Sequence, residues 1–284
     1  DNQMLDGRTR EDGTSCGFGG CRYSRPADRK DSFENWSPKL GLSYQMSGSK
    51  PRENSLLFVN IARGFRAPQA TELYRLQRQQ TSADLESVQL DSYEAGFRFQ
   101  SGLLNYELAY YQMYKDNVIY RDSSYFNLSN GKTDHQGLEI RVDYAINNAL
   151  NLSVNGSFAQ HQYANDQLIA GVNINGNYVD TAPRHFGAAQ LNWAITDALL
   201  VELEWLHQGS YYMDAENLHR YQGHDLINLR ADWQLGPQWS VNVRINNVTD
   251  VAYAERADYT SFTEERYFPG MPLSLFLGVQ WHGG

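Results

Sequence analysis

The sequence predicts an all-β fold, an antiparallel transmembrane β-barrel. From residue 37 onward, apolar and polar side chains alternate with period two in segments of about ten residues. Aromatic residues make up 13% of a chain whose mean hydropathy is only −0.60. The links between the segments alternate between short and long, as they do in barrels that cross a membrane.

Eleven segments have the period of a strand. We expect strands over 38–47, 55–65, 91–101, 103–120, 135–146, 150–163, 185–195, 199–212, 224–235, 239–250 and 272–282. The alternation is clearest in the last of these, where Leu273, Leu275, Leu277, Val279 and Trp281 share one face. Segments of helical period and useful length do not compete with this assignment, and no apolar run approaches the roughly 20 residues of a membrane helix.

The two faces of these strands differ in a way that favours a barrel in lipid. The apolar faces often end in Trp or Tyr, as an interfacial aromatic girdle does. The polar faces carry charges of both signs at strand centres, and these side chains would face a lumen: Glu139, Arg141, Asp143, Glu202, Glu204, Arg230, Asp232 and Arg244.

The links predict which end of the barrel is which. Residues 101–102, 147–149, 196–198 and 236–238 are tight turns, and 48–54 is intermediate. The long links are 66–90, 121–134, 164–184, 213–223 and 251–271. Strict alternation places every long link at one rim, which a soluble sandwich has no reason to do. If the final strand ends at the periplasmic rim, the long links are external, and so is the segment 1–37.

Segment 1–37 contains both cysteines, Cys16 and Cys21, with three glycines among the four residues between them. A local disulfide is sterically plausible and fits an oxidising compartment. Free thiols are the alternative, and a metal site would need more soft ligands nearby.

Charge, terminus and strand number limit the remaining possibilities. Lys and Arg number 24 against 33 Asp and Glu, a net charge of −9, so a nucleic-acid partner is not expected. The chain begins with Asp1 and shows no signal peptide, so we expect it to be an internal piece of a longer protein. An odd number of strands cannot close an antiparallel barrel, and open edges are costly in lipid. Either the chain is part of a larger barrel, or the strand count is wrong by one.

Five motifs resemble those of one family. They are Ser37-Pro38-Lys39-Leu40-Gly41-Leu42, Ala62-Arg63-Gly64-Phe65-Arg66-Ala67-Pro68 followed by Glu72-Leu73, Asp91-Ser92-Tyr93-Glu94-Ala95-Gly96, Asn246-Asn247-Val248-Thr249-Asp250 and Pro269-Gly270-Met271-Pro272-Leu273-Ser274. In this order, over about residues 36–281, they resemble the TonB-dependent outer-membrane receptors. The resemblance implies a barrel of about 22 strands with a plugged lumen, of which this chain would be the C-terminal eleven.

The resemblance also implies partners that the chain itself lacks. The plug domain and the other barrel half would precede it, and the TonB-ExbB-ExbD energy-coupling complex would act through that missing part. The charged lumen residues would then pair with plug charges. Trp281 takes the place of the family's terminal aromatic residue, followed by His282-Gly283-Gly284. The expected location is the outer membrane of a Gram-negative bacterium, in contact with its lipid.

Catalysis, cofactors and metals are not expected. The carboxylate pair Glu202 and Glu204 could suggest glycoside hydrolysis, but two such residues on one strand more often face a wet lumen. His219, His224, Asp214, Glu216 and Asp225 form a loose cluster that fits no metal motif, so a solvated loop is the default interpretation.

The long links supply the candidate ligand contacts. Arginine and aromatic side chains suit an anionic, partly aromatic iron chelate. These candidates are Arg66, Tyr74, Arg75, Arg78, Tyr178, Arg184, Tyr212, Tyr221, Tyr253, Tyr259, Phe262, Arg266 and Tyr267. The expected function is energised uptake, with a ferric siderophore as the first substrate and cobalamin or an oligosaccharide as alternatives. Haem is disfavoured, because Ser82-Ala83-Asp84-Leu85 replaces the family's haem motif and 69–81 holds no His. A passive porin and a soluble β-sandwich adhesin or hydrolase are the rival classes.

Overall fold

A computed structural model describes residues 23–24, 30–47, 53–74, 76–77, 83–121, 127–169 and 171–283. Most of segment 1–37, including Cys16 and Cys21, lies outside the described residues, and so do Arg75 and Arg78. The disulfide, the external position of that segment and the role of those two arginines therefore stay predictions.

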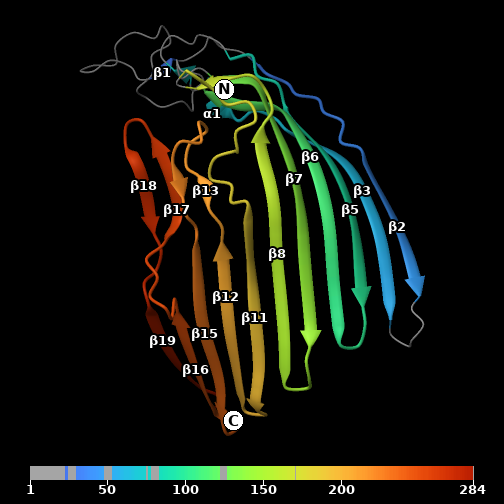
Figure 1. Cartoon of the computed structure of the whole chain (residues 1–284), viewed down its shortest axis with the longest axis vertical. Coiled ribbons are helices and arrows are strands. Elements are labelled where there is room, and N and C mark those ends of the chain that lie inside the picture. The colour runs from blue at the N-terminus through green and yellow to red at the C-terminus, as the bar shows by residue number, and fades with distance from the viewer. Residues whose placement is uncertain are drawn as a thin grey trace.

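One antiparallel sheet of eleven strands forms most of the described part of the chain (Figure 1). In chain order its strands are β2 (Lys39–Ser47), β3 (Asn54–Arg66), β5 (Val88–Gln100), β6 (Leu104–Arg121), β7 (Asn127–Ala145), β8 (Leu150–Tyr163), β11 (His185–Thr196), β12 (Leu199–Gln208), β15 (His224–Leu235), β16 (Trp239–Asn246) and β19 (Ser274–Trp281). Each strand pairs with the one that precedes it and the one that follows it in this order. All eleven predicted strands are therefore confirmed, and β2 and β19 form the two edges of an open sheet.

The register divides the side chains between two faces. On β12, Leu203 lies opposite Leu229 and Trp205 lies opposite Ile227. The side chain of Glu202, which lies opposite Arg230, points to the other face of the sheet. The same division continues through all ten strand pairs, because side chains alternate along a strand and align across it. We call the side of Leu203 the apolar face and the side of Glu202 the inner face.

Many side chains of the apolar face are exposed. Leu203 is 45% exposed and Leu277 69%, values that a packed core would not show. Four tryptophans mark its border near the short turns: Trp193, Trp233, Trp239 and Trp281. Trp239 and Trp281 lie opposite each other on the last two strands. This arrangement agrees with the predicted girdle between lipid and water.

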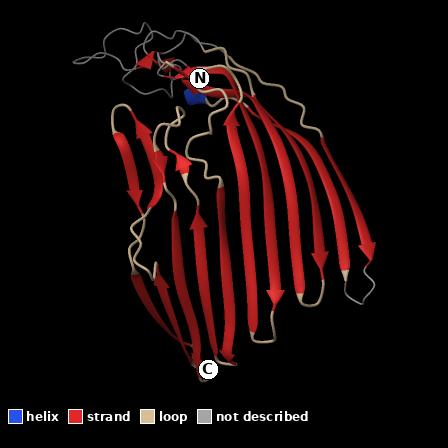
Figure 2. Cartoon of the chain, viewed as in Figure 1, coloured by secondary structure: helices blue, strands red, loops and turns tan. Residues whose placement is uncertain are grey.

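The connections alternate in length as predicted, except after β6, where only residues 122–126 separate β6 from β7. Figure 1 shows the short links after β5, β7, β11 and β15 at one end of the sheet and the longer links after β8, β12 and β16 at the other. The long links carry their own structure: helix α1 (Ala70–Tyr74) and the strand pairs β1 (Tyr23–Ser24) with β4 (Leu76–Gln77), β9 (Leu168–Ile169) with β10 (Val172–Asn173), β13 (Tyr211–Tyr212) with β14 (Arg220–Tyr221), and β17 (Ala254–Thr260) with β18 (Glu264–Pro269). Figure 2 shows α1 beside the long-link end of the sheet. No helix among the described residues has the length and hydropathy to span a membrane.

Three predicted boundaries were wrong. The link expected over 121–134 is mostly strand, because β7 begins at Asn127 and continues the β6–β7 hairpin. The strand expected over 199–212 ends at Gln208, where the chain turns before the short strand β13. The strand expected over 239–250 ends at Asn246, because Asn247 and Asp250 adopt positive φ angles of 51° that stop the ladder.

The two faces can be tested with one substitution at two positions. Leu203 on the apolar face and Leu200 on the inner face of β12 are 45% and 43% exposed. In lipid, Leu203→Arg should lower the free energy of unfolding by about 2–4 kcal/mol, because it moves a charge into hydrocarbon. Leu200→Arg should cost clearly less, since that position lies on the inner face beside Glu202. Urea unfolding of the intact protein in vesicles measures both, and equal losses would contradict this assignment of faces.

Candidate functional site

The long links pack into a unit with its own core at one end of the sheet. Tyr211, Met213, Tyr221, Ala254 and Ala257 are buried against one another. We call this group the loop core. Met213 also ties neighbouring segments together through its backbone, since its N–H bonds the carbonyl of His219 and its carbonyl accepts from Tyr259 N.

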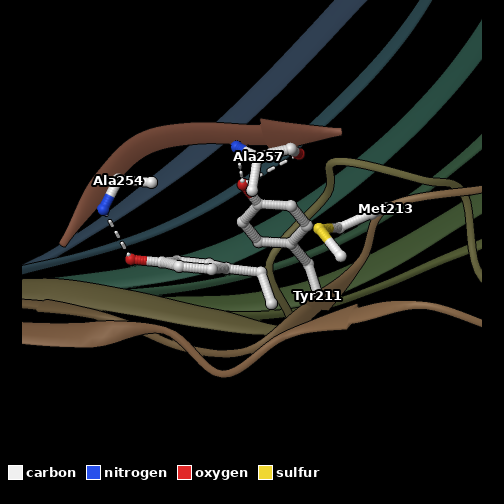
Figure 3. Close-up of a cluster of buried hydrophobic side chains, with 5 residues drawn as sticks. Tyr211, Met213, Ala254 and Ala257 are labelled. Carbon is white, nitrogen blue, oxygen red and sulfur yellow. Dashed lines mark hydrogen bonds between the residues drawn. The ribbon is translucent and has the colours of Figure 1, made fainter. Parts of the chain in front are cut away.

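Two tyrosine hydroxyls hold β17 in place (Figure 3). Tyr211 Oη accepts a hydrogen bond from Ala257 N at 2.7 Å and donates to Ala257 O at 3.2 Å. Tyr221 Oη accepts from Ala254 N at 3.1 Å. Burial raises the pKa of Tyr211, so its hydroxyl keeps the proton that it donates. Both tyrosines thus satisfy backbone groups that a short hairpin cannot pair by itself.

The outer side of the β17–β18 hairpin presents two arginines around one ring. Arg256 and Arg266 both form ion pairs with the carboxylate of Asp258, at 3.0 and 2.6 Å, and Arg266 donates a hydrogen bond to it. Their guanidinium carbons also lie 5.9 and 5.8 Å from the centre of the Phe268 ring. Asp258 is buried, whereas Arg256 is 63% and Arg266 44% exposed. The sequence prediction included Arg266 but missed Arg256, which the alternation of side chains along a hairpin strand could have indicated.

The loose cluster of His219, His224, Asp214, Glu216 and Asp225 does not form one site. His219 stacks on Tyr259, with ring centres 3.5 Å apart, and lies 3.4 Å from Asp214. His224 instead bonds Tyr221 Oη. Among the described residues, no group of three or more His, Cys, Asp or Glu side chains is placed to hold a metal ion.

The other candidate ligand contacts are divided among several places. Arg66 forms a two-bond ion pair with Glu72, and Tyr74 donates to Asp31 at 2.6 Å. Phe262 is 94% exposed at the tip of the β17–β18 hairpin. Tyr253 lies against His224, and Tyr267 donates to Glu265 while its ring lies 6.4 Å from Tyr221.

Tyr178, Arg184 and Tyr212 form a separate group. The rings of Tyr178 and Tyr212 stack at 6.0 Å, and the Arg184 guanidinium lies 4.9 Å from the Tyr178 ring centre. Tyr178 forms an antiparallel bridge with Gln162 on β8. On β8, the side chains of Gln162, Phe158 and Val154 lie on the same side of the sheet, which is the apolar face. Tyr178 lies opposite Gln162, so this group is also on the side of the apolar face.

The inner face carries the predicted charges as connected networks. The register places all eight predicted lumen residues on this one side of the sheet. Arg230 bonds both Glu202 and Glu204, and Glu204 also accepts from Asn228 at 2.8 Å and Gln190 at 2.9 Å. A second pair, Arg98 with Glu107, was missed, although the same alternation along β5 and β6 would have found it.

Asn247 connects this wall to the last long link. Its N–H donates to Asn228 Oδ1 at 2.8 Å, and its side chain bonds the backbone of Val251 and Met271. The side chain of Asn247 is almost fully buried. The residue that ends β16 therefore also fixes where the loop over 251–271 begins and returns.

A histidine pair on the inner face was also missed. His135 and His161 lie opposite each other on β7 and β8, with their Nδ1 atoms 2.8 Å apart. They lie beyond the apolar belt, because the outward neighbours in the same strands, Gln136 and Gln160, are polar. Burial and the neighbouring His161 lower the pKa of His135 to about 4, and burial lowers that of His161. Only the register of two strands brings the pair together.

Removing one hydroxyl tests how the loops are held. Tyr211→Phe should destabilise the β17–β18 hairpin locally by about 1–2 kcal/mol, since it leaves Ala257 N unpaired in a buried place. Limited proteolysis over 254–269 measures the opening. Tyr212→Phe is the matched control, because it keeps the ring that stacks on Tyr178. Equal cleavage of both variants and the unmodified protein would contradict this role.

The histidine pair predicts a pH response. The folded pair binds fewer protons than free histidines, so its contribution is complete above pH 6.5 and decreases as pH falls from 6.5 toward about 4. Hydrogen exchange at the ends of β7 and β8 should become roughly five to ten times faster at pH 5 than at pH 7.5, after correction for intrinsic rates. The double variant His135→Gln, His161→Gln should remove this dependence. If the double variant keeps it, another group is responsible.

Comparison with known proteins agrees with this architecture. The sequence profile of the family described as TonB dependent receptor-like, beta-barrel matches residues 6–248. No curated protein matches the chain.

Several solved structures share the fold. The ferric yersiniabactin uptake receptor FyuA from Yersinia pestis is 17% identical with a TM-score of 0.68, over 86% of this chain and 36% of that one. The siderophore receptor PiuA from Acinetobacter baumannii is 14% identical with a TM-score of 0.67, over 81% and 35%. The ferripyoverdine receptor of Pseudomonas aeruginosa is 17% identical with a TM-score of 0.66, over 86% and 32%.

The chain spans about a third of the length of these structures. The sheet has two open edges, as expected if its eleven strands correspond to part of a larger barrel. Members of the matched family are transporters of the Gram-negative outer membrane and not enzymes. With the profile match over most of its length, the chain belongs to the TonB-dependent receptor family, as part of the β-barrel.

Proposed function

We propose that the protein containing this chain takes up a ferric siderophore across the outer membrane with energy supplied through the TonB-ExbB-ExbD complex. The proposal concerns the whole receptor, because the plug and the coupling segment would lie in parts that this chain does not include. The long links would be external, and the inner face would line the path.

The arrangement of Arg256, Phe268 and Arg266 carries the proposal. Both guanidinium groups are exposed beside the Phe268 ring, whereas Asp258, the carboxylate that pairs with both, is buried. Glu264 lies on the same side of the hairpin, one pair further toward its tip. Guanidinium groups bind carboxylates and catecholates through charge-assisted hydrogen bonds, and an exposed ring stacks on an aromatic chelate. Phe262 at the hairpin tip would add apolar contact. We leave Tyr221 out of the proposed contacts because it is buried in the loop core.

The structural neighbours support the substrate class. Three of those named above are described as receptors for ferric yersiniabactin, a siderophore and ferripyoverdine. Another, OprC, is described as a copper transporter at 13% identity. Copper is therefore a second probe for the uptake assay, beside cobalamin and an oligosaccharide.

The inner face suits contact with a plug. Glu139, Arg141, Asp143, Glu202, Glu204, Arg230, Asp232 and Arg244 combine charges of both signs on one wall. We propose that these groups pair with charges of the plug at rest. Movement of the plug would exchange those partners for water and open a path along the wall.

Ligand binding is tested on the hairpin. Arg256→Gln should weaken binding of the transported ferric siderophore about tenfold, because it removes a charge-assisted contact while Arg266 still pairs with Asp258. Phe262→Ala should weaken it less. Ser261→Ala, at the same tip, is the control that should bind normally. The measurement is titration of the intact receptor with ferric catecholate, hydroxamate and carboxylate siderophores, and with copper(II), cyanocobalamin and maltohexaose. Binding of another probe in place of every siderophore would replace the proposed substrate.

Energy coupling separates a gated receptor from a passive porin. Uptake of the ferric siderophore that binds should stop in cells without TonB, whereas binding to the outer membrane should persist. Uptake that continues without TonB would favour the porin and contradict the proposed mechanism.

A further inference from the structure

The apolar face is hollowed at one place near the long-link end. A depression of about 580 Å³ lies over β7, β8, β11 and β12, lined by Ile140, Val154, Gly156, Phe158, Gly187 and Trp205 among others. Most of its lining is apolar, although His185, His207 and Asp225 stand at its border. It opens on the side of the sheet that faces lipid.

Two glycines account for the depression. Gly156 on β8 and Gly187 on β11 lie directly opposite each other and both point to the apolar face. Ring-bearing neighbours stand on either side, Phe158 on β8 and Trp205 on β12. A Cβ at Gly156 would meet only ordinary contacts, at 3.7 Å, with Ile140 Cγ2 and Phe186 O. The position of Gly156 therefore has room for a side chain and is left empty, whereas a Cβ at Gly187 would lie 2.5 Å from Asn155 O. We call the depression over these two residues the glycine groove.

Polar side chains border the groove at the end that is nearer the long links. Asp225 accepts from His207 Nδ1 at 2.8 Å and from Trp205 Nε1 at 2.9 Å. Because the carboxylate only accepts, His207 donates through Nδ1, and its Nε2 lies 2.8 Å from His185 Nδ1. Asp225, His207 and His185 thus form a connected series of polar side chains. His185, the last of them, also lines a second depression.

The second depression, of about 470 Å³, adjoins the first and shares Phe158 and His185 with it. Arg184 and Arg220 line it together with Tyr110, Gln136 and Gln160, and its lining contains no carboxylate. Gln136 donates to Gln160 at 3.0 Å, and Tyr110 donates to Gln136 at 3.4 Å, so a ladder of amides forms its floor. Both arginines are exposed, and Arg220 bonds the Ser210 hydroxyl.

We propose that the two depressions form one binding site for a phosphate-bearing lipid of the external leaflet. An acyl chain would lie in the glycine groove, and the phosphate would bind Arg184 and Arg220 beside His185. Three observations agree on this occupant: the groove opens into hydrocarbon, the adjoining hollow is basic, and the two meet near the end of the apolar belt. Guanidinium groups bind phosphate through paired hydrogen bonds. The site depends on the long links being external, and it is separate from the β17–β18 hairpin.

The measurement is native mass spectrometry of the intact receptor, extracted in a mild detergent and titrated with lipid A. Phosphatidylcholine with phosphatidylethanolamine and inorganic phosphate are the comparison probes. Lipid A should bind as a discrete adduct, and neither comparison probe should displace it at equal concentration. The double variant Arg184→Gln, Arg220→Gln should weaken lipid A binding by at least about tenfold. Gly156→Leu should do the same by filling the groove.

Matched controls exclude general effects on folding or on lipid contact. Ala95→Leu adds an apolar side chain to the same lipid-facing side of the sheet, but on β5, away from the groove. Arg98→Gln removes an arginine from the inner face. Both should bind lipid A as the unmodified receptor does. Unchanged binding in the arginine and glycine variants would overturn the proposal. Displacement by inorganic phosphate alone would reduce the site to an anion site, and displacement by the zwitterionic lipids would reduce it to an acyl groove.

Discussion

The constraint on which the rest of this structure depends is that no backbone N–H or C=O can remain unpaired in hydrocarbon. An antiparallel ladder satisfies this within the sheet and sends alternate side chains to opposite faces. The chain follows it through eleven strands in which every interior strand pairs on both sides. The same ladder explains why one face can be exposed and apolar while the other carries Glu202, Glu204 and Arg230.

The two ends of the sheet solve different problems. The short turns only need to reverse the chain beside a border of tryptophans. The long links have to hold a shape outside the sheet, and they do so with side chains acting as backbone partners. Tyr211 and Tyr221 hold β17, and Asn247 joins the inner wall to the last long link. These bonds connect the charged wall with the hairpin where we propose that ligand binds, so the two parts of the proposed transport path are physically continuous.

The lipid-facing side is not uniform either. Opposed glycines at Gly156 and Gly187 remove side chains where other strands present Leu, Val or Ile. Close packing against β8 requires glycine at Gly187, where a Cβ would lie 2.5 Å from Asn155 O, but a Cβ at Gly156 would meet only ordinary contacts, so a side chain there would add contacts. The arginines of the adjoining hollow lie at the border between hydrocarbon and water, where a cationic side chain gains most from an anionic headgroup. Uptake and lipid contact would therefore use different faces of the same strands.

The sequence by itself determined the strands, their faces and the alternation of short and long links, because a period of two is a local property that each strand carries alone. The sequence was thus sufficient to place the eight charged residues on one face of the sheet and to identify the family, whose motifs are also local. It did not determine where β7 begins or where β16 ends, since those boundaries depend on a hairpin partner and on positive φ angles. The candidate site was harder still. His135 with His161, Arg256 with Phe268, and Arg184 with Arg220 lie near each other only through register and loop packing. Only the tertiary structure decides such pairs, because they join residues whose separation in sequence contains no periodic signal.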